Sequence, residues 1–164
     1  MAGWWSTKTR QAVRHALGRV SDAEHAKLTT QLSEPQLALF DSMHRADQRH
    51  GFDVAAVLRA EGHDDPELLL AALLHDCSKG PGVRLPHRVA WSLGERYGEG
   101  VLDVFGHMPG FRAAFERLRH HADDSARLAG DAGCSERTAE LIRHQADPVD
   151  PEAGVALQLA DEAS

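Results

Sequence analysis

The stretch LLLAALLHDCSKG, residues 68–80, determines the architecture that we expect for this chain. Its first seven residues are all apolar, which predicts a helix that is buried on every side. Asp65 and Pro66 stand just before it, as is typical of a helix start, and a Gly- and Pro-rich segment follows its end. The buried helix therefore ends in an adjacent imidazole and carboxylate, His75 and Asp76.

Helical spacing of apolar residues continues on both sides of this stretch. Ser21 and Ser33 are predicted helix caps, and Gly62 is predicted to end a helix that follows His50. Further helical patterns cover residues 89–97, 101–105, 111–118, 122–132, 135–143 and 151–161. Aromatic residues make up only 5% of the chain, and its apolar content comes largely from Ala and Leu. Because no segment shows the alternation of a strand, we expect an all-α helical bundle.

A length of 164 residues fits one domain. We expect residues 34–164 to form its body and residues 1–33 to form an N-terminal helical extension that packs on it. Apolar residues from Trp4 to Val20 recur at helical spacing, with basic residues between them. Such a helix could dock on an anionic partner or a membrane, but packing of Trp4 and Trp5 on the body is the interpretation that we favour.

The balance of charges restricts the ligands that the chain can bind. Its net charge of -7 argues against binding along a nucleic-acid duplex, which needs many Lys and Arg side chains. A small phosphorylated substrate held by a metal ion remains compatible with that charge. Two cysteines, Cys77 and Cys134, make no disulfide framework, which indicates the cytoplasm, and no apolar run has the length of a membrane span.

The pair His75-Asp76 predicts a metal site. Burying an imidazole and a carboxylate without partners is costly, and a divalent ion bound to both removes that cost. The chain holds eleven His, a high number beside one Tyr and three Met. A second such pair, His63-Asp64, follows the helix-ending Gly62 and precedes a helix start, so helix-cap chemistry in solvent explains it.

The string AALLHDCSKG, residues 71–80, together with an earlier His and a distal Asp, resembles the HD-domain superfamily of metal-dependent phosphohydrolases. The resemblance spans residues 37–161 and implies that residues 34–164 are an HD domain. It also implies that one divalent ion is bound by His50, His75, Asp76 and Asp161.

Some members of this superfamily bind two ions, and further residues match their pattern. His121, predicted to begin a helix, and His144, predicted to end the next, would hold the second ion, with Asp76 bridging the pair. His120 is a rival for His121. Many two-metal members have a second His where this chain has Gln145, and the Gly-Tyr-Pro signature of the cyclic-dinucleotide branch is absent.

By this resemblance, the chain is expected to hydrolyse a phosphate ester, such as a nucleotide. A bound Mn, Fe, Co, Zn or Mg ion lowers the pKa of water to about 7, so that metal-bound hydroxide attacks the phosphorus. Asp76 and Lys79 would be the catalytic residues, and Lys79 and Arg49 would hold the phosphate. Lys79 could instead favour a helix end, and Arg49 could be solvated.

Two other functions stay open at this point. A few HD-fold relatives hold a di-iron centre that activates oxygen with similar ligands, and redox-active iron with oxygen uptake would identify such an oxygenase. A non-catalytic HD domain that senses a nucleotide or packs against a partner would use Trp4, Trp5 and the basic N-terminal helix. The intact ligand set argues against this sensor or scaffold.

Overall fold

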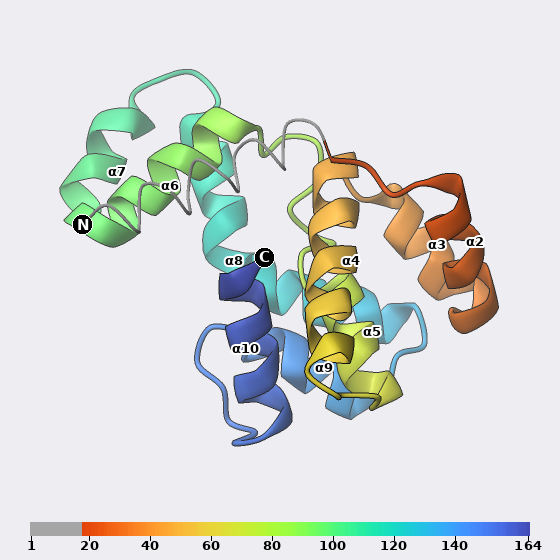
Figure 1. Ribbon diagram of the computed structural model, residues 1–164. Coiled ribbons are helices and arrows are strands. Elements are labelled where there is room, and N and C mark those ends of the chain that lie inside the picture. Colours follow the sequence, from red (N-terminus) through yellow and green to blue (C-terminus); the bar gives the residue numbers. More distant parts are fainter. Residues whose placement is uncertain (1–17) are drawn as a thin grey trace.

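The computed structural model describes residues 18–164, and within that range it contains nine α-helices and no strand (Figure 1). The predicted all-α fold is confirmed. The helices are α2 (Asp22–Gln31), α3 (Glu34–Ser42), α4 (Arg45–Ala60), α5 (Pro66–Leu74), α6 (Leu85–Tyr97), α7 (Glu99–Gly106), α8 (Phe111–Asp131), α9 (Glu136–Arg143) and α10 (Ala153–Ala163). The helix expected over residues 4–20 lies outside the described residues except for residues 18–20, which are not helical.

Helix α5 lies in the main hydrophobic core, where it packs against α4, α9 and α10 (Figure 1). Asp65 caps its first turn by accepting a hydrogen bond from the Glu67 amide, and Pro66 occupies its first position. Its buried residues are Leu68, Ala71, Ala72, Leu73 and Leu74. The expectation of burial on every side is wrong at Leu69 and Leu70. Both are half-buried, because they line a cavity of about 760 Å³ beside the ends of α2 and α4.

Helices α4 and α5 come into close backbone contact at Gly51. A Cβ atom at this position would lie 2.7 Å from the Leu73 carbonyl oxygen and 3.1 Å from that of Ala72. Only a residue without a side chain fits between the two backbones. The contact brings the preceding residue, His50, to the C-terminal end of α5.

Helices α6 and α7 and the first half of α8 form a small lobe with a hydrophobic core of its own, seen at the upper left of Figure 1. Phe111 and Phe115 on α8 meet edge to face in this core, with ring centroids 5.8 Å apart. Its other buried residues are Val83, Ala90, Ala114 and Leu118. The lobe is joined to the main body by the continuous helix α8 and by an ion pair between Arg88 on α6 and Asp47 on α4.

Helix α8 is one continuous helix of 21 residues, whereas the sequence pattern predicts two, over residues 111–118 and 122–132. The prediction that His121 begins a helix is therefore wrong, since His121 lies near the middle of α8. The apolar pattern is interrupted by Arg119, His120 and His121, where α8 passes from the core of the small lobe to the main core. The backbone continues through them because none of the three is Gly or Pro.

Of the predicted N-terminal extension, the structure describes residues 18–33. Leu28 on α2 is buried in the main core together with Phe40. Glu24, also on α2, accepts hydrogen bonds from Arg49 on α4. No helix between residues 18 and 164 combines the length and the hydropathy that crossing a membrane requires.

Substitution of Gly51 by Ala tests the close contact of α4 and α5. The added methyl group meets backbone atoms that cannot rotate away, so we expect Gly51→Ala to lower the free energy of unfolding by about 1–3 kcal/mol. Gly130→Ala is the matched control, because Gly130 is an exposed residue of α8 with open space around its missing Cβ. The control is expected to be neutral or slightly stabilising. Urea denaturation of both variants measures the difference, and equal stability would refute the contact.

Candidate metal centre

His75 and Asp76 lie at the end of α5 and are almost completely buried, at 1% and 2% exposure. The His75 Nδ1 donates a hydrogen bond to the Ala72 carbonyl oxygen at 2.9 Å, which leaves Nε2 as the atom that faces the site. Neither His75 Nε2 nor Asp76 Oδ1 has a hydrogen-bond partner among the described residues. Two buried atoms of metal-ligating type therefore face the same space with their polar capacity unused.

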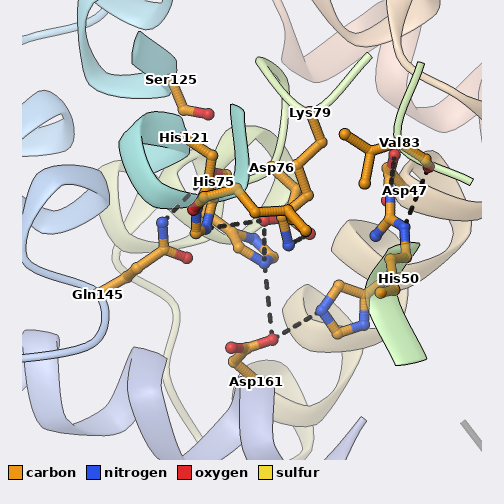
Figure 2. Close-up of polar contacts among 12 residues, drawn as sticks. Asp47, His50, His75, Asp76, Lys79, Val83, His121, Ser125, Gln145 and Asp161 are labelled. Atoms are coloured by element: carbon orange, nitrogen blue, oxygen red, sulfur yellow. Dashed lines mark hydrogen bonds and ion pairs between the residues drawn. The ribbon is translucent and has the colours of Figure 1, made fainter. Parts of the chain in front are cut away.

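His50 and Asp161 complete this side of the site from two other helices (Figure 2). His50 lies on α4 and Asp161 on α10, and the His50 Nε2 is 2.6 Å from the Asp161 Oδ1. The same oxygen is 3.6 Å from the His75 Nε2. One ligand atom each from His50, His75 and Asp76 lies within 4.8 Å of the other two, so this group could hold a metal ion. The structure thus brings three of the four residues predicted for the first ion into one group and places the fourth, Asp161, beside two of them.

His121 reaches the site from the middle of α8. Its Nε2 lies 3.7 Å from the Asp76 Oδ1, while its Nδ1 donates a hydrogen bond to the Leu118 carbonyl oxygen at 2.6 Å. The neighbouring His120 has a side chain 61% exposed, with its Nε2 3.8 Å from a carboxylate oxygen of Glu116. Of the two rivals, His121 is therefore the one that faces the centre.

A pair of serines fixes α8 against the turn that carries Asp76. The Ser78 amide donates to the Ser125 Oγ at 3.1 Å, and the Ser125 Oγ donates to the Ser78 Oγ at 3.0 Å. The Ser78 hydroxyl in turn donates to the His121 carbonyl oxygen at 2.8 Å. These bonds set the position of the His121 backbone relative to Asp76.

His144, the last residue predicted as a metal ligand, makes its contact elsewhere. It follows the end of α9, and its Nε2 lies 3.4 Å from a carboxylate oxygen of Glu140 in that helix. The next residue, Gln145, is buried and donates a hydrogen bond from its amide to the His75 carbonyl oxygen at 3.4 Å. The group that could hold an ion consists of His50, His75 and Asp76; His144 is outside it, as are Asp161 and His121, which nevertheless lie beside its members.

The two side chains predicted to hold a phosphate lie in different surroundings. The Lys79 Nζ is 2.6 Å from the Asp76 Oδ2, so this ammonium lies at the centre itself. Arg49 points away to ion pairs with Glu24 on α2 and Asp53 on α4, and its guanidinium also lies over the ring of Phe52. Arg49 therefore joins α2 to α4. The sequence had suggested that this side chain holds a phosphate or lies in solvent.

Sequence analysis missed a buried carboxylate beside the centre, Asp47. It is 1% exposed, and the Arg88 Nη2 on α6 lies 2.7 Å and 2.8 Å from its two oxygens. Burial raises the pKa of Asp47, and the nearby carboxylate of Asp76 raises it further. A signal was present in the sequence: Asp47 is three residues before His50, hence one helical turn away on the same face of a helix.

Charges of both signs meet at the centre. Burial opposes ionisation of His75, but the carboxylates of Asp76 and Asp161 outweigh it and raise the pKa of His75 to about 9. Partial burial opposes ionisation of Asp161 too, but its hydrogen bond with His50 and the nearby imidazole of His75 hold its pKa well below the usual range. Two ionised carboxylates thus face two imidazoles across a shared space. This mixed set of nitrogen and oxygen donors fits a divalent transition metal.

Comparison with protein-family models, with curated proteins and with solved structures finds no match for this chain. The resemblance to the HD-domain superfamily accordingly stays a prediction. That His50, His75 and Asp76 could hold a metal ion rests on the distances between their ligand atoms alone.

Removal of the Asp161 carboxylate tests its place among the ligands. We expect Asp161→Asn to lower the affinity for a divalent ion at least about tenfold, since even residues that only orient metal ligands have effects of this size. His120→Ala is the matched control, because this exposed imidazole stands next to His121 but faces away from the centre. Elemental analysis and competition with a metal-binding dye measure the affinity. Unchanged affinity of the Asp161 variant would exclude it as a ligand.

The affinity for the metal should depend on pH in a predictable direction. Without a metal, the pKa of His75 near 9 keeps its imidazole protonated at neutral pH, whereas a metal ion binds only the neutral ring. Each bound ion must therefore displace a proton, so we expect the affinity to rise between pH 6.5 and pH 8, by up to about tenfold per pH unit. Dye competition at several pH values measures this slope. Equal affinities at both ends of the range would contradict it.

Proposed function

We propose that this protein is a metal-dependent phosphohydrolase of the HD type that cleaves a phosphate ester of a small molecule, such as a nucleotide. The observation that carries the proposal is that two buried ligand atoms, His75 Nε2 and Asp76 Oδ1, have no hydrogen-bond partner among the described residues and face His50 and Asp161. Buried polar groups without hydrogen bonds are costly, so their retention at one point of the core supports a bound ligand.

The centre is closed on one side and open on the other. The side chains of His75 and Asp76 are each 2% exposed, whereas those of His50 and Asp161 are 27% and 39% exposed. A substrate can therefore approach the centre from the side of His50 and Asp161. The burial of the opposite side lowers the local dielectric response and strengthens every charge interaction there.

The protein's own residues would hold the ion and stabilise the phosphate. His50, His75, Asp76 and Asp161 are the residues that would bind a divalent ion, which supplies an acidified water and neutralises charge on phosphoryl oxygens. The hydrogen bond from His75 to Ala72 fixes the orientation of the ring, so that Nε2 is the atom that would bind the ion. Lys79 places a positive charge beside Asp76, and this charge would help to stabilise the negative charge of a phosphate bound at the centre.

The net charge of the chain supports a small substrate over a polymer, because a surplus of acids repels an extended phosphate backbone. The two remaining alternatives are distinguished by experiment. An oxygenase would hold redox-active iron and take up oxygen. A non-catalytic sensor would bind a nucleotide without turnover, and the N-terminal helix proposed for its contacts lies largely outside the described residues.

Hydrolysis assays test the proposal directly. We expect protein loaded with Mn, Co, Zn or Mg to cleave at least one compound of a panel of nitrophenyl phosphate esters and nucleotides. In the double variant His75→Ala/Asp76→Ala, cleavage should fall to the uncatalysed background, because the ion has lost its buried ligands. His120→Ala should retain the full rate. Absence of hydrolysis with every metal, or oxygen uptake by an iron-loaded sample, would contradict a phosphohydrolase.

A further inference from the structure

A buried ion pair joins the small lobe to α4 close to the centre (Figure 2). The Arg88 Nη2 on α6 lies 2.7 Å from the Asp47 Oδ1 and 2.8 Å from the Asp47 Oδ2. Asp47 is 1% exposed, and the side chain of Arg88 is 18% exposed. The Arg88 Nε also donates a hydrogen bond to the Val83 carbonyl oxygen at 3.4 Å, so two contacts fix the guanidinium.

The stability of the folded chain does not explain this pair. Moving two charges out of water costs free energy that their attraction in the interior often fails to recover, and an apolar pair of similar size gives comparable stability. An ion pair differs from an apolar contact in being directional, because the donor nitrogen must face the carboxylate oxygens. The contact between Arg88 and Asp47 therefore defines how α6 lies against α4.

Packing inside the two hydrophobic cores does not set the angle between the lobe and α4. No buried residue of the described chain belongs to both cores. Helix α8 runs from one core to the other, and a single long helix can bend. Its polar residues 119–121 lie where it passes between the cores. The ion pair of Arg88 with Asp47 supplies a second attachment of the lobe, on a different helix.

This second attachment lies next to the open side of the centre. Asp47 precedes His50 by three residues, hence by about one helical turn on the same face of α4. The side chain of His50 is 27% exposed and belongs to the side from which a substrate can approach. Burial raises the pKa of Asp47 and the carboxylate of Asp76 raises it further, whereas Arg88 and Lys79 oppose this rise. The lobe thus meets α4 within electrostatic reach of the centre.

We propose that Asp47 and Arg88 are positioning residues, whose ion pair holds the small lobe against α4 so that the lobe forms one wall of the side on which substrate binds. The role in substrate binding rests on the proposed function. Neither residue contacts the reacting atoms. Without the pair the lobe tilts away from α4, and substrate binds more weakly although the residues of the centre stay in place.

The position of the lobe can be measured without metal or substrate. Spin labels are attached at Glu61→Cys, an exposed site at the end of α4, and at Val104→Cys, an exposed site on α7. Cys134 is replaced by Ser, and the remaining cysteine is buried. Pulsed electron paramagnetic resonance then gives the distribution of distances between the labels. We expect a narrow distribution that becomes broad or shifted in Asp47→Leu/Arg88→Met, and an unchanged narrow distribution overturns the proposal.

An exposed ion pair within α8, Asp124 with Arg127, provides the matched control. Asp124→Leu/Arg127→Met makes the same two substitutions inside one helix, so the label distance should stay narrow. Both double variants remove one charge of each sign and leave the net charge unchanged. Arg88→Met alone leaves Asp47 buried without its counter-ion, and we expect it to unfold at a lower urea concentration than Asp47→Leu/Arg88→Met.

Substrate kinetics separate a positioning role from a merely structural one. We expect Asp47→Leu/Arg88→Met to raise KM about tenfold and to change kcat by less than about threefold, although its stability to urea is close to that of the unmodified protein. A KM that recovers together with the stability overturns the proposal. If this variant does not fold, Arg88→Lys decides, because Lys keeps the charge but lacks the planar guanidinium. A broad label distance in Arg88→Lys supports the proposal, and a narrow one with an unchanged KM overturns it.

The label distance is independent of catalysis, so the two proposals can fail separately. A distance that broadens on loss of the pair, in a protein that hydrolyses no phosphate ester, contradicts the proposed function and leaves the attachment of the lobe by Asp47 and Arg88 standing. A distance that stays narrow, in a double variant that hydrolyses with unchanged KM, contradicts the positioning role and leaves the phosphohydrolase standing.

Discussion

The burial of His75 and Asp76 at the end of the most apolar helix is the constraint around which this protein is organised. Both side chains would be costly inside a hydrophobic core without partners, and three other helices bring such partners to them. Helix α4 approaches closely enough to present His50 because Gly51 has no side chain. Helix α10 presents Asp161, and α8 is fixed by serine hydrogen bonds that place His121 beside Asp76.

Charge balance connects this centre to the rest of the molecule. Asp76 is paired with Lys79, and the buried Asp47 is paired with Arg88 on the small lobe of α6, α7 and the first half of α8. Isolated buried charges are unfavourable, so each of these groups is stabilised in the interior by its oppositely charged neighbour. The small lobe has its own hydrophobic core, and Arg88 makes it part of the electrostatic environment of the centre.

The helices and the central pair could be predicted because both depend on local information. The periodicity of apolar residues determines where a helix forms, and residues such as Asp65 and Pro66 mark its start. Errors arose where local information was ambiguous. The polar residues 119–121 interrupt the apolar pattern and so suggest two helices. They mark the point where the single helix α8 passes from one hydrophobic core to the other.

An all-α chain with a His-Asp pair buried at the end of an apolar helix follows from the order of the residues, because helix formation and the placement of apolar residues around a helix are properties of short segments. The order of the residues does not determine that His121, and not His120, faces the centre. Nor does it determine that Arg49 pairs with Glu24 and Asp53, or that Asp47 pairs with Arg88. Each depends on how helices dock against one another. Docking is set by side-chain packing summed over the whole core, so the partners of a charged side chain are known only once the helices are in place.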